Sequence, residues 1–300
     1  MGIFEKYLPQ KLHRGLTARR IKKLVRAPSL LLKNIKFWWV NEASRERHIF
    51  VVGPPRSGTT LVKNVLRGNT KIYSTDGETY FFFRRNYASF RHDAIPDARM
   101  KKIIERATSA TDLFDRFAKE VKQSPGEQIF LEKTPEHALL IDRIIECFPR
   151  AKIIFVVRDP RDGFCSAKRN PRYWHSLPES NPLLAYAETW RRSARSYLEL
   201  QDYGNLYLQS YEAFCHNPQD SLENLHSFLE IEIQKSQLHP SSYGKTDLGD
   251  LKGQRRLRKP ITAATVGRWK EELQKEEIDS IEGHIGEEMR ILDYNLHSHS

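Results

Sequence analysis

Residues 53–60 read Gly-Pro-Pro-Arg-Ser-Gly-Thr-Thr and directly follow a short apolar run, residues 48–52. A strand that ends in a loop with two glycines and continues into a helix presents backbone N–H groups and the positive helix end to one anion. The second glycine permits a close approach of that anion, which a side chain would block. The residues expected to bind it are Arg56, Ser57, Gly58, Thr59 and Thr60.

The spacing of the two glycines matches the signature GxxxxGK[ST] of nucleoside-triphosphate-binding loops. The residue after Gly58 is Thr59 instead of lysine, and the cation lies inside the loop at Arg56. Kinases and triphosphatases need that lysine on the β- and γ-phosphates and a metal beside them. A kinase or triphosphatase is therefore the disfavoured alternative. The sequence also contains no His, Cys and Asp pattern with the spacing of metal ligands, so we expect no metal site.

A second stretch whose residues could bind a ligand begins at the end of the apolar run 152–157, where Arg158 and Asp159 lie. Open α/β sheets bind their ligands at the carboxyl ends of the strands. Ser166 follows eight residues after Arg158, about two turns into the next expected helix. A guanidinium fork and a hydroxyl could both reach one phosphate. The sequence therefore predicts a second phosphate site on the same sheet.

The elements that position these residues alternate between strand and helix. Apolar runs predict strands at 48–52, 128–131, 152–157 and 205–209. Helices are expected at 59–66, 97–123 (with a break near 109–112), 136–148, 161–168, 183–202, 218–230 and within 268–292. Residues 170–182 form a polar, proline-bearing insert, and the pattern dissolves after 235. The alternation predicts an α/β fold, a three-layer α/β/α arrangement around a central parallel sheet.

The chain has 300 residues, and Lys and Arg exceed Asp and Glu by 49 to 38, a net charge of +11, so an anionic partner is expected. Ten of the basic residues lie among the first 36, beside a single acid. We expect a basic N-terminal extension (1–45) and one domain (46–300). The extension ends in the aromatic residues 37–39, which could dock on the domain or, as the less favoured alternative, contact an anionic membrane surface.

The three cysteines are widely spaced without a CxxC pair, and the first residues lack the pattern of a signal peptide. A reducing, cytoplasmic location is therefore expected. Apolar runs also fall short of a membrane span. A non-catalytic, basic module that binds polyanions is an alternative from another functional class, but such a module needs no pair of ordered phosphate sites.

At this point the motifs resemble those of sulfotransferases. The loop at 53–60 looks like their 5′-phosphosulfate loop, and Arg158 with Ser166 looks like their 3′-phosphate motif. The resemblance implies 3′-phosphoadenosine 5′-phosphosulfate (PAPS) as the donor, PAP as the product, and no metal. It also implies in-line transfer of the sulfuryl group to a hydroxyl or amine, without a specific nucleic-acid partner.

Further stretches agree with this resemblance. GETYFFF at 77–83 is similar to stretches of heparan-type and tyrosylprotein-type sulfotransferases, which implies Glu78 as the catalytic base. EKTPEH at 132–137 resembles the heparan-type Glu-Lys-Thr-Pro, which implies Lys133 as a catalytic residue. SYEAFCHNP at 210–218 resembles a family stretch whose tyrosine contacts the adenine, here Tyr211. The stretch 256–270 is the counterpart of a loop that covers the nucleotide. The candidates for a basic contact there are Arg258, Lys259 and Arg268, of which Arg268 enters the predicted site.

One departure separates the chain from the cytosolic phenol and steroid type, which carries its base as a histidine where this chain has Pro135. The chain is therefore more similar to the heparan, tyrosylprotein and bacterial types, and His137 is a second-choice base. The acceptor is not fixed by these motifs. Basic residues in the loop 80–96 point to an anionic acceptor such as a glycan or a lipid head group, namely Arg84, Arg85, Arg91 and His92. The oligomeric state is not encoded in any motif.

Overall fold

A parallel β-sheet forms the centre of the protein. The computed structural model describes residues 32, 34, 36, 37, 42–83, 87–122, 128–239 and 260–297. Within this part of the chain the sheet has five strands in the order β2-β3-β1-β4-β5. They are β1 (Ile49–Val52), β2 (Ile72–Tyr73), β3 (Ile129–Lys133), β4 (Lys152–Val157) and β5 (Leu206–Ser210). All neighbours pair in parallel, so their carboxyl ends meet at one edge.

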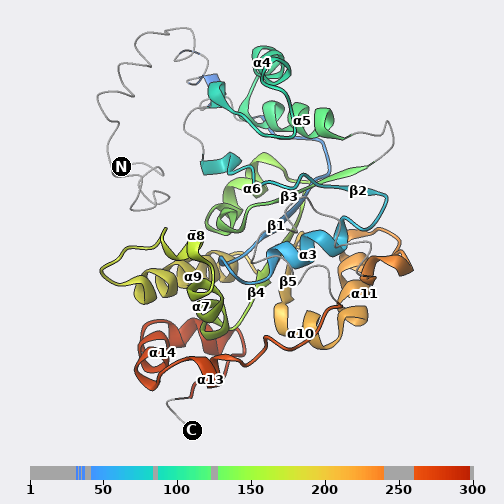
Figure 1. Ribbon diagram of the computed structural model, residues 1–300. Helices are drawn as coiled ribbons and strands as arrows, with labels where there is room; N and C mark the ends of the chain where they lie inside the picture. The colour runs from blue at the N-terminus through green and yellow to red at the C-terminus, as the bar shows by residue number, and fades with distance from the viewer. Residues whose placement is uncertain are drawn as a thin grey trace.

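The strands are apolar on both faces because helices cover both sides of the sheet. In β4, Ile153, Phe155 and Val157 belong to one core cluster, and Ile154 and Val156 belong to the other. Side chains alternate between the faces of a strand, so a strand buried on both sides must be apolar at every position. The expected three-layer α/β fold is confirmed (Figure 1).

Helices α3 (Thr59–Leu66) and α11 (Pro218–Leu229) supply apolar residues to the smaller cluster. Helices α5 (Ala110–Val121), α6 (Ile141–Cys147), α7 (Pro160–Lys168), α9 (Pro182–Leu198) and α14 (Lys275–Ile291) pack into the larger one. The remaining α-helices among the described residues are α4 (Asp97–Arg106), α8 (Pro171–Trp174), α10 (Tyr211–His216) and α13 (Trp269–Glu272). The same part of the chain contains 3₁₀ turns at Phe81–Phe83, Tyr87–Ser89, Pro135–Leu140 and Lys235–Leu238. No described helix is long and apolar enough to cross a membrane.

The break expected near 109–112 is confirmed, since α4 ends at Arg106 and Ser109 accepts a hydrogen bond from the Asp112 N–H, which caps α5 as a separate helix. The helices expected within 268–292 are α13 and a kinked α14. Other elements differ from the sequence expectations: the expected helix 136–148 starts as a 3₁₀ turn before α6. Strand β2 and helix α8 were not predicted.

The end of the N-terminal extension docks on the domain at two described residues. The Phe37 ring is buried and meets the Tyr87 ring edge-on, with 6.2 Å between centroids. Asn34 is also buried, and its Oδ1 accepts a hydrogen bond from the Ala88 N–H at 3.0 Å. Trp38 and Trp39 lie outside the described residues. The division at residue 45 stays a prediction.

Candidate active site

The phosphate-loop candidate lies at the carboxyl end of β1 and is packed directly against β4. Gly53 has φ +150°, and a Cβ there would come within 2.1 Å of the Val156 carbonyl oxygen. Its N–H donates to the Pro135 carbonyl at 3.2 Å. Gly58, at φ +93°, caps the N-terminus of α3. The loop can therefore run this close to the sheet only with glycine at its start, and helix α3 begins at its end.

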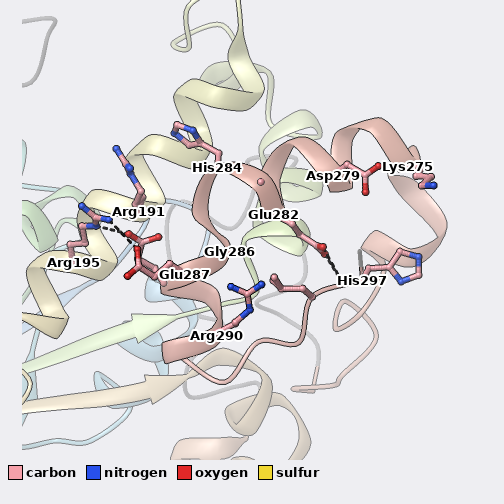
Figure 2. Close-up of a pocket in the computed structure, with 13 residues that line it drawn as sticks. Arg191, Arg195, Lys275, Asp279, Glu282, His284, Gly286, Glu287, Arg290 and His297 are labelled. Atoms are coloured by element: carbon pink, nitrogen blue, oxygen red, sulfur yellow. Dashed lines mark hydrogen bonds and ion pairs between the residues drawn. The ribbon is translucent and has the colours of Figure 1, made fainter. Parts of the chain in front are cut away.

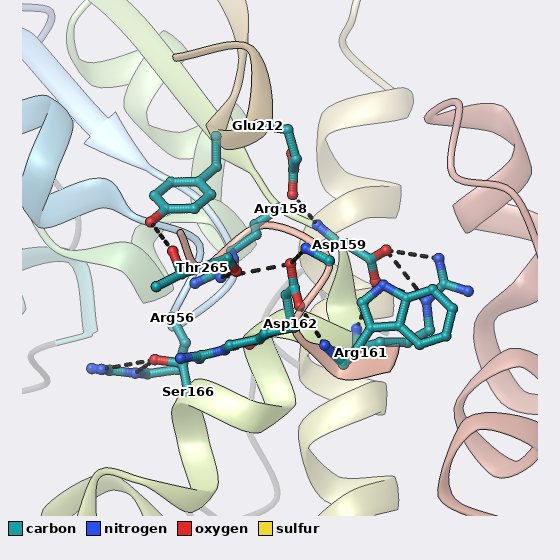
Figure 3. A network of polar contacts seen from close by, with 12 residues as sticks. Arg56, Arg158, Asp159, Arg161, Asp162, Ser166, Glu212 and Thr265 are labelled. Atoms are coloured by element: carbon teal, nitrogen blue, oxygen red, sulfur yellow. Dashed lines mark hydrogen bonds and ion pairs between the residues drawn. The ribbon is translucent and has the colours of Figure 1, made fainter. Parts of the chain in front are cut away.

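Arg56 crosses from this loop to helix α7. Its Nε and Nη2 donate to Ser166 Oγ at 3.2 and 3.1 Å (Figure 3). Its backbone has φ +73°, a strained conformation for a residue with a side chain. Burial, and to a smaller extent the charge of Arg158, lowers the pKa of the guanidinium. The sequence grouped Ser166 with Arg158, and the structure pairs it with Arg56.

The hydroxyl of Ser57 is the second polar group of the loop. Ser57 is fully buried, and its Oγ has no hydrogen-bond partner among the described residues. Thr59, the first residue of α3, is also buried. A buried hydroxyl without a partner is costly unless a ligand satisfies it. Together with the first N–H groups of α3, which as in any helix have no partner within the preceding turn, it fits a bound phosphate-type group.

Arg158 and Tyr211 form the second phosphate-site candidate. The Arg158 guanidinium lies 4.3 Å from the centroid of the Tyr211 ring, and its Nη2 donates to the Thr265 carbonyl at 2.5 Å (Figure 3). Its Nε is buried and lacks a partner within the described part of the chain. The Tyr211 ring also packs on Gly58, where a Cβ would lie 2.3 Å from its Cδ2. Tyr211 therefore connects the two predicted phosphate motifs.

Asp162 attaches the C-terminal segment to this site. Its carboxylate accepts the N–H of Gly267 at 2.8 Å and the N–H of Trp269 at 3.0 Å. Arg268 Nη2 donates to the Asp162 carbonyl at 3.2 Å, so Arg268 reaches helix α7. Burial raises the pKa of the Asp162 carboxyl. The sequence analysis missed Asp162, although its place one turn after Arg158 was a signal. Arg258 and Lys259 lie outside the described residues.

Buried ion pairs fix the beginning of α7. Asp159 caps the helix by accepting the Arg161 N–H, and its carboxylate also pairs with the Arg161 guanidinium at 2.7 Å. Arg161 also reaches Glu282 on α14 at 2.6 Å. The Trp190 Nε1–H of α9 donates to the Arg158 carbonyl at 3.0 Å. Two long helices therefore hold the backbone that presents Arg158.

Glu78 and Lys133 meet at the end of β3. Lys133 is the last residue of the strand, its side chain is 6% exposed, and its Nζ pairs with Glu78 Oε1. Glu78 Oε2 accepts a hydrogen bond from the Tyr80 hydroxyl at 2.5 Å. The structure thus brings together the expected base and the expected lysine, which are 55 residues apart. It adds Tyr80, to which the sequence analysis gave no role in the site.

Lys63 supports the segment that leads to Glu78 and was also missed. It is 1% exposed, and its Nζ donates to the carbonyls of Thr75 at 3.0 Å and Asp76 at 3.3 Å. Burial, and then the charge of Lys133, lowers its pKa to about 7. A lysine within the apolar stretch of α3 was the available signal.

His137, the second-choice base, belongs to a buried support network. Its Nδ1 pairs with Glu132 Oε2 at 3.0 Å, and its Nε2 accepts the Phe82 N–H at 3.3 Å. Glu132 also accepts the hydroxyls of Thr79 at 2.8 Å and Thr134 at 2.5 Å. Both ring nitrogens are engaged and the ring is fully buried, so His137 is not exposed to an acceptor in this structure. Its role is to hold the backbone beside Glu78.

A cavity with a volume of about 780 Å³ lies elsewhere, between α9 and α14 (Figure 2). Its described lining contains none of the predicted site residues. Much of its charge is internally paired: Arg195 binds Glu288, and Glu282 accepts the His297 N–H at 2.9 Å. The cavity is therefore separate from the chemistry of the phosphate loop.

Comparisons with known proteins agree with this geometry. A putative protein-tyrosine sulfotransferase of Caenorhabditis briggsae is 25% identical over 203 residues, 65% of this chain and 69% of that protein. The sulfotransferase domain from the curacin biosynthetic pathway superposes with a TM-score of 0.66 at 18% identity, covering 85% of this chain and 100% of that domain. A mouse sulfotransferase complexed with PAP gives 0.54 at 18% identity, with 87% and 89% covered. These two structures show that the fold is shared.

The family assignment comes from the sequence match itself. A model of the sulfotransferase family matches residues 48–235, which is more than half of the chain. The matched region includes the loop 53–60, Glu78, Lys133, Arg158 and Tyr211. The expected class of enzyme, a sulfotransferase, is thereby confirmed. This chain belongs to the sulfotransferase family.

Proposed function

We propose that the protein transfers a sulfuryl group from PAPS to a hydroxyl or amine of an acceptor. The observation that carries this proposal is the meeting of two unsatisfied anion sites beside one carboxylate. The loop after β1 offers Ser57 and Arg56, and the end of β4 leads to Arg158, whose Nε has no partner among the described residues. PAPS carries a 5′-phosphosulfate and a separate 3′-phosphate, so two sites match its two anionic groups. The mouse enzyme of the same fold was solved with PAP.

Each binding residue has a role that follows from its place. The amides at 58–60 and the Ser57 hydroxyl would bind the 5′-phosphosulfate, since they lie at the N-terminus of α3. Arg158 would bind the 3′-phosphate, with Ser166 and Arg268 on the adjacent helix α7 and turn. Tyr211 lies between the two motifs, where an adenosine would connect them.

The chemistry then needs one base and several fixed positive charges. Glu78 accepts the proton of the attacking hydroxyl, a role worth about 10²–10⁴-fold in rate. The new bond forms between that oxygen and sulfur while the bond from sulfur to the 5′-phosphate oxygen breaks. Negative charge grows on the departing phosphate, where Arg56 and the loop amides stabilise it. Lys133 stabilises charge at the bridging oxygen and keeps Glu78 in position.

The acceptor suggested by the basic loop, a glycan or lipid head group, stays a prediction. Arg91 pairs with Asp97 at 3.1 Å, so its charge is matched, and Arg84 and Arg85 lie outside the described residues. Membrane contact by the N-terminal extension and a cytoplasmic location are also predictions. The relative from Caenorhabditis briggsae is named for transfer to protein tyrosine, which supports a hydroxyl as the attacking group.

Calorimetric titration with PAP in the absence of magnesium tests the donor site. We expect micromolar binding of PAP and weak binding of ATP. The affinity of Arg158→Ala for PAP should be about 10- to 100-fold lower, since hydrogen bonds to charged groups contribute about 1.5–3 kcal/mol. The exposed Arg106→Ala is the matched control. Magnesium-dependent ATP binding would favour a kinase instead. Salt-sensitive polyanion binding without PAP binding would favour the non-catalytic module.

Glu78→Gln tests the base. The variant keeps the size of the side chain and removes the proton acceptor, so turnover of PAPS should fall about 10²–10⁴-fold while PAP affinity stays nearly unchanged. Equal turnover in Glu78→Gln and the wild-type protein would exclude Glu78 as the base.

A further inference from the structure

The hydroxyl of Tyr80 lies where an acceptor hydroxyl would have to lie. A general base must be within hydrogen-bond reach, about 2.6–3.2 Å, of the proton that it removes. Tyr80 donates its phenolic O–H to Glu78 Oε2 at 2.5 Å. The protein's own side chain therefore already presents a phenol to the carboxylate that the proposed mechanism uses.

The backbone at Tyr80 is held in an unusual conformation that produces this contact. Its φ is +48°, in the left-handed region that residues with side chains seldom adopt, at a cost of about 1–3 kcal/mol. The Tyr80 N–H donates to Thr134 Oγ1 at 3.3 Å, and the next N–H, of Phe81, donates to Thr79 Oγ1 at 3.2 Å. Both hydroxyls in turn bind the buried Glu132. The strain is thus maintained by a buried network directly beside the base.

The ring of Tyr80 points outward and stays accessible. Its residue is 42% exposed, whereas the next two phenylalanines are buried in the core. Burial of the hydroxyl and the negative charges of Glu136 and Glu78 raise the pKa of the phenol. The phenol therefore keeps its proton at neutral pH and donates it only to a base in direct contact.

Two cations that the transfer requires interact with the same carboxylate, one by direct contact and one through its charge. Lys133 pairs with the other oxygen of Glu78, and the charge of Glu78 also acts on the Arg56 guanidinium. A nucleophile, a base and positive charges on the phosphate-loop side are therefore assembled within one chain. Groups held together in this way react with large effective concentrations.

We propose that Tyr80 is a site of self-sulfation, an inference that rests on the proposed function. When PAPS is bound without an acceptor, the Tyr80 oxygen attacks its sulfur. A bond forms from this oxygen to sulfur, the bond from sulfur to the 5′-phosphate oxygen breaks, and the phenolic proton passes to Glu78. The products are tyrosine O-sulfate at residue 80 and PAP. The new anion would lie beside Glu78 and Glu136, so the modified enzyme would turn over acceptors more slowly.

Intact-protein mass spectrometry of the full chain after incubation with PAPS alone tests this proposal. We expect a gain of one sulfuryl group per chain, located at residue 80 by peptide mapping. Tyr80→Phe should show no gain, and Glu78→Gln should show a rate at least about 100-fold lower. Tyr207→Phe, on strand β5, is the control that should behave like the wild-type protein. The rate should not depend on protein concentration, because the transfer is intramolecular.

Binding of PAP, measured by calorimetry on the same samples, separates the possible failures. Wild-type protein that binds PAP but gains no sulfuryl group, or gains it at another tyrosine, overturns self-sulfation and leaves the proposed function standing. Protein that binds no PAP overturns both. Tyr80→Phe must bind PAP like the wild-type protein, which shows that its lack of modification is not a folding defect.

Discussion

The buried lysine of helix α3 leads to a prediction about stability and pH. Lys63 is 1% exposed, and its pKa falls from the ordinary value of 10.5 to about 7, mainly because burial disfavours the charged form. Below pH 7 the folded protein must carry this charge in its interior, and the full free-energy cost of burying the charge lowers its stability. Above pH 10.5 lysine is neutral in both states, and the penalty is gone. Between these values the unfolded chain binds more protons, so stability rises with pH.

The size of this effect follows from the shift. Each unit of pKa difference corresponds to about 1.4 kcal/mol. Replacing Lys63 by methionine removes the titration, so the free-energy difference between wild-type and variant protein should change by about 2.5 kcal/mol between about pH 7.5 and 9.5. The wild-type protein gains stability relative to the variant across this range. Hydrogen bonds lost to Thr75 and Asp76 shift the variant's curve but not its slope.

Urea unfolding followed by circular dichroism at several pH values measures this difference. The exposed Lys71→Met is the control, and its curve should stay parallel to the wild-type curve. Parallel curves for Lys63→Met and the wild-type protein would show that Lys63 is charged in the folded state up to its ordinary pKa. The reasoning from burial would then be wrong.

Three further changes test other contacts of the site. Gly58→Ala should weaken PAP binding at least tenfold in calorimetry, because left-handed strain (~1–2 kcal/mol) adds to the clash with Tyr211; unchanged affinity would contradict this packing. Asp162→Asn should make residues 260–270 more susceptible to limited proteolysis, since it weakens the hydrogen bonds that the carboxylate accepts from two backbone N–H groups of that segment. A cleavage pattern like that of the wild-type protein would contradict this role of Asp162. His137→Phe should lower the unfolding free energy by about 1–3 kcal/mol, because Glu132 Oε2 loses its partner in the buried network. Its turnover per folded molecule should persist, and a loss as large as that of Glu78→Gln would restore His137 as a base.

The strands with strong local patterns were predictable from the sequence. The run 153–157 is apolar at every position and is followed by a charged pair, which is typical of a strand at the centre of a parallel sheet. Strand β2 has only two residues at the edge of the sheet, too few to leave a pattern. Helix α8 is a single turn inside the polar insert, started by Asn170, and a proline-bearing stretch of this kind resembles a loop.

The candidate site was predictable residue by residue but not as a set of contacts. The order β3-β1-β4 places Lys133, the phosphate loop and Arg158 on adjacent strand ends, and this order arises only from the crossovers of the folded chain. The pairing of Arg56 with Ser166 spans 110 residues, and no local spacing specifies it. The sequence therefore suggested that Ser166 shares a ligand with Arg158, while the folded chain gives it another partner.

The sequence by itself determined the glycines of the loop, the cation within it, the apolar strands and the family. These depend on backbone conformation and on hydrophobic pattern, which are local properties. The tertiary structure decided which polar residues are buried and what they touch: Lys63 near neutrality, His137 fully engaged, and Tyr80 on the carboxylate of Glu78. Burial and electrostatic environment depend on residues distant in sequence, so these properties exist only once the layers have packed.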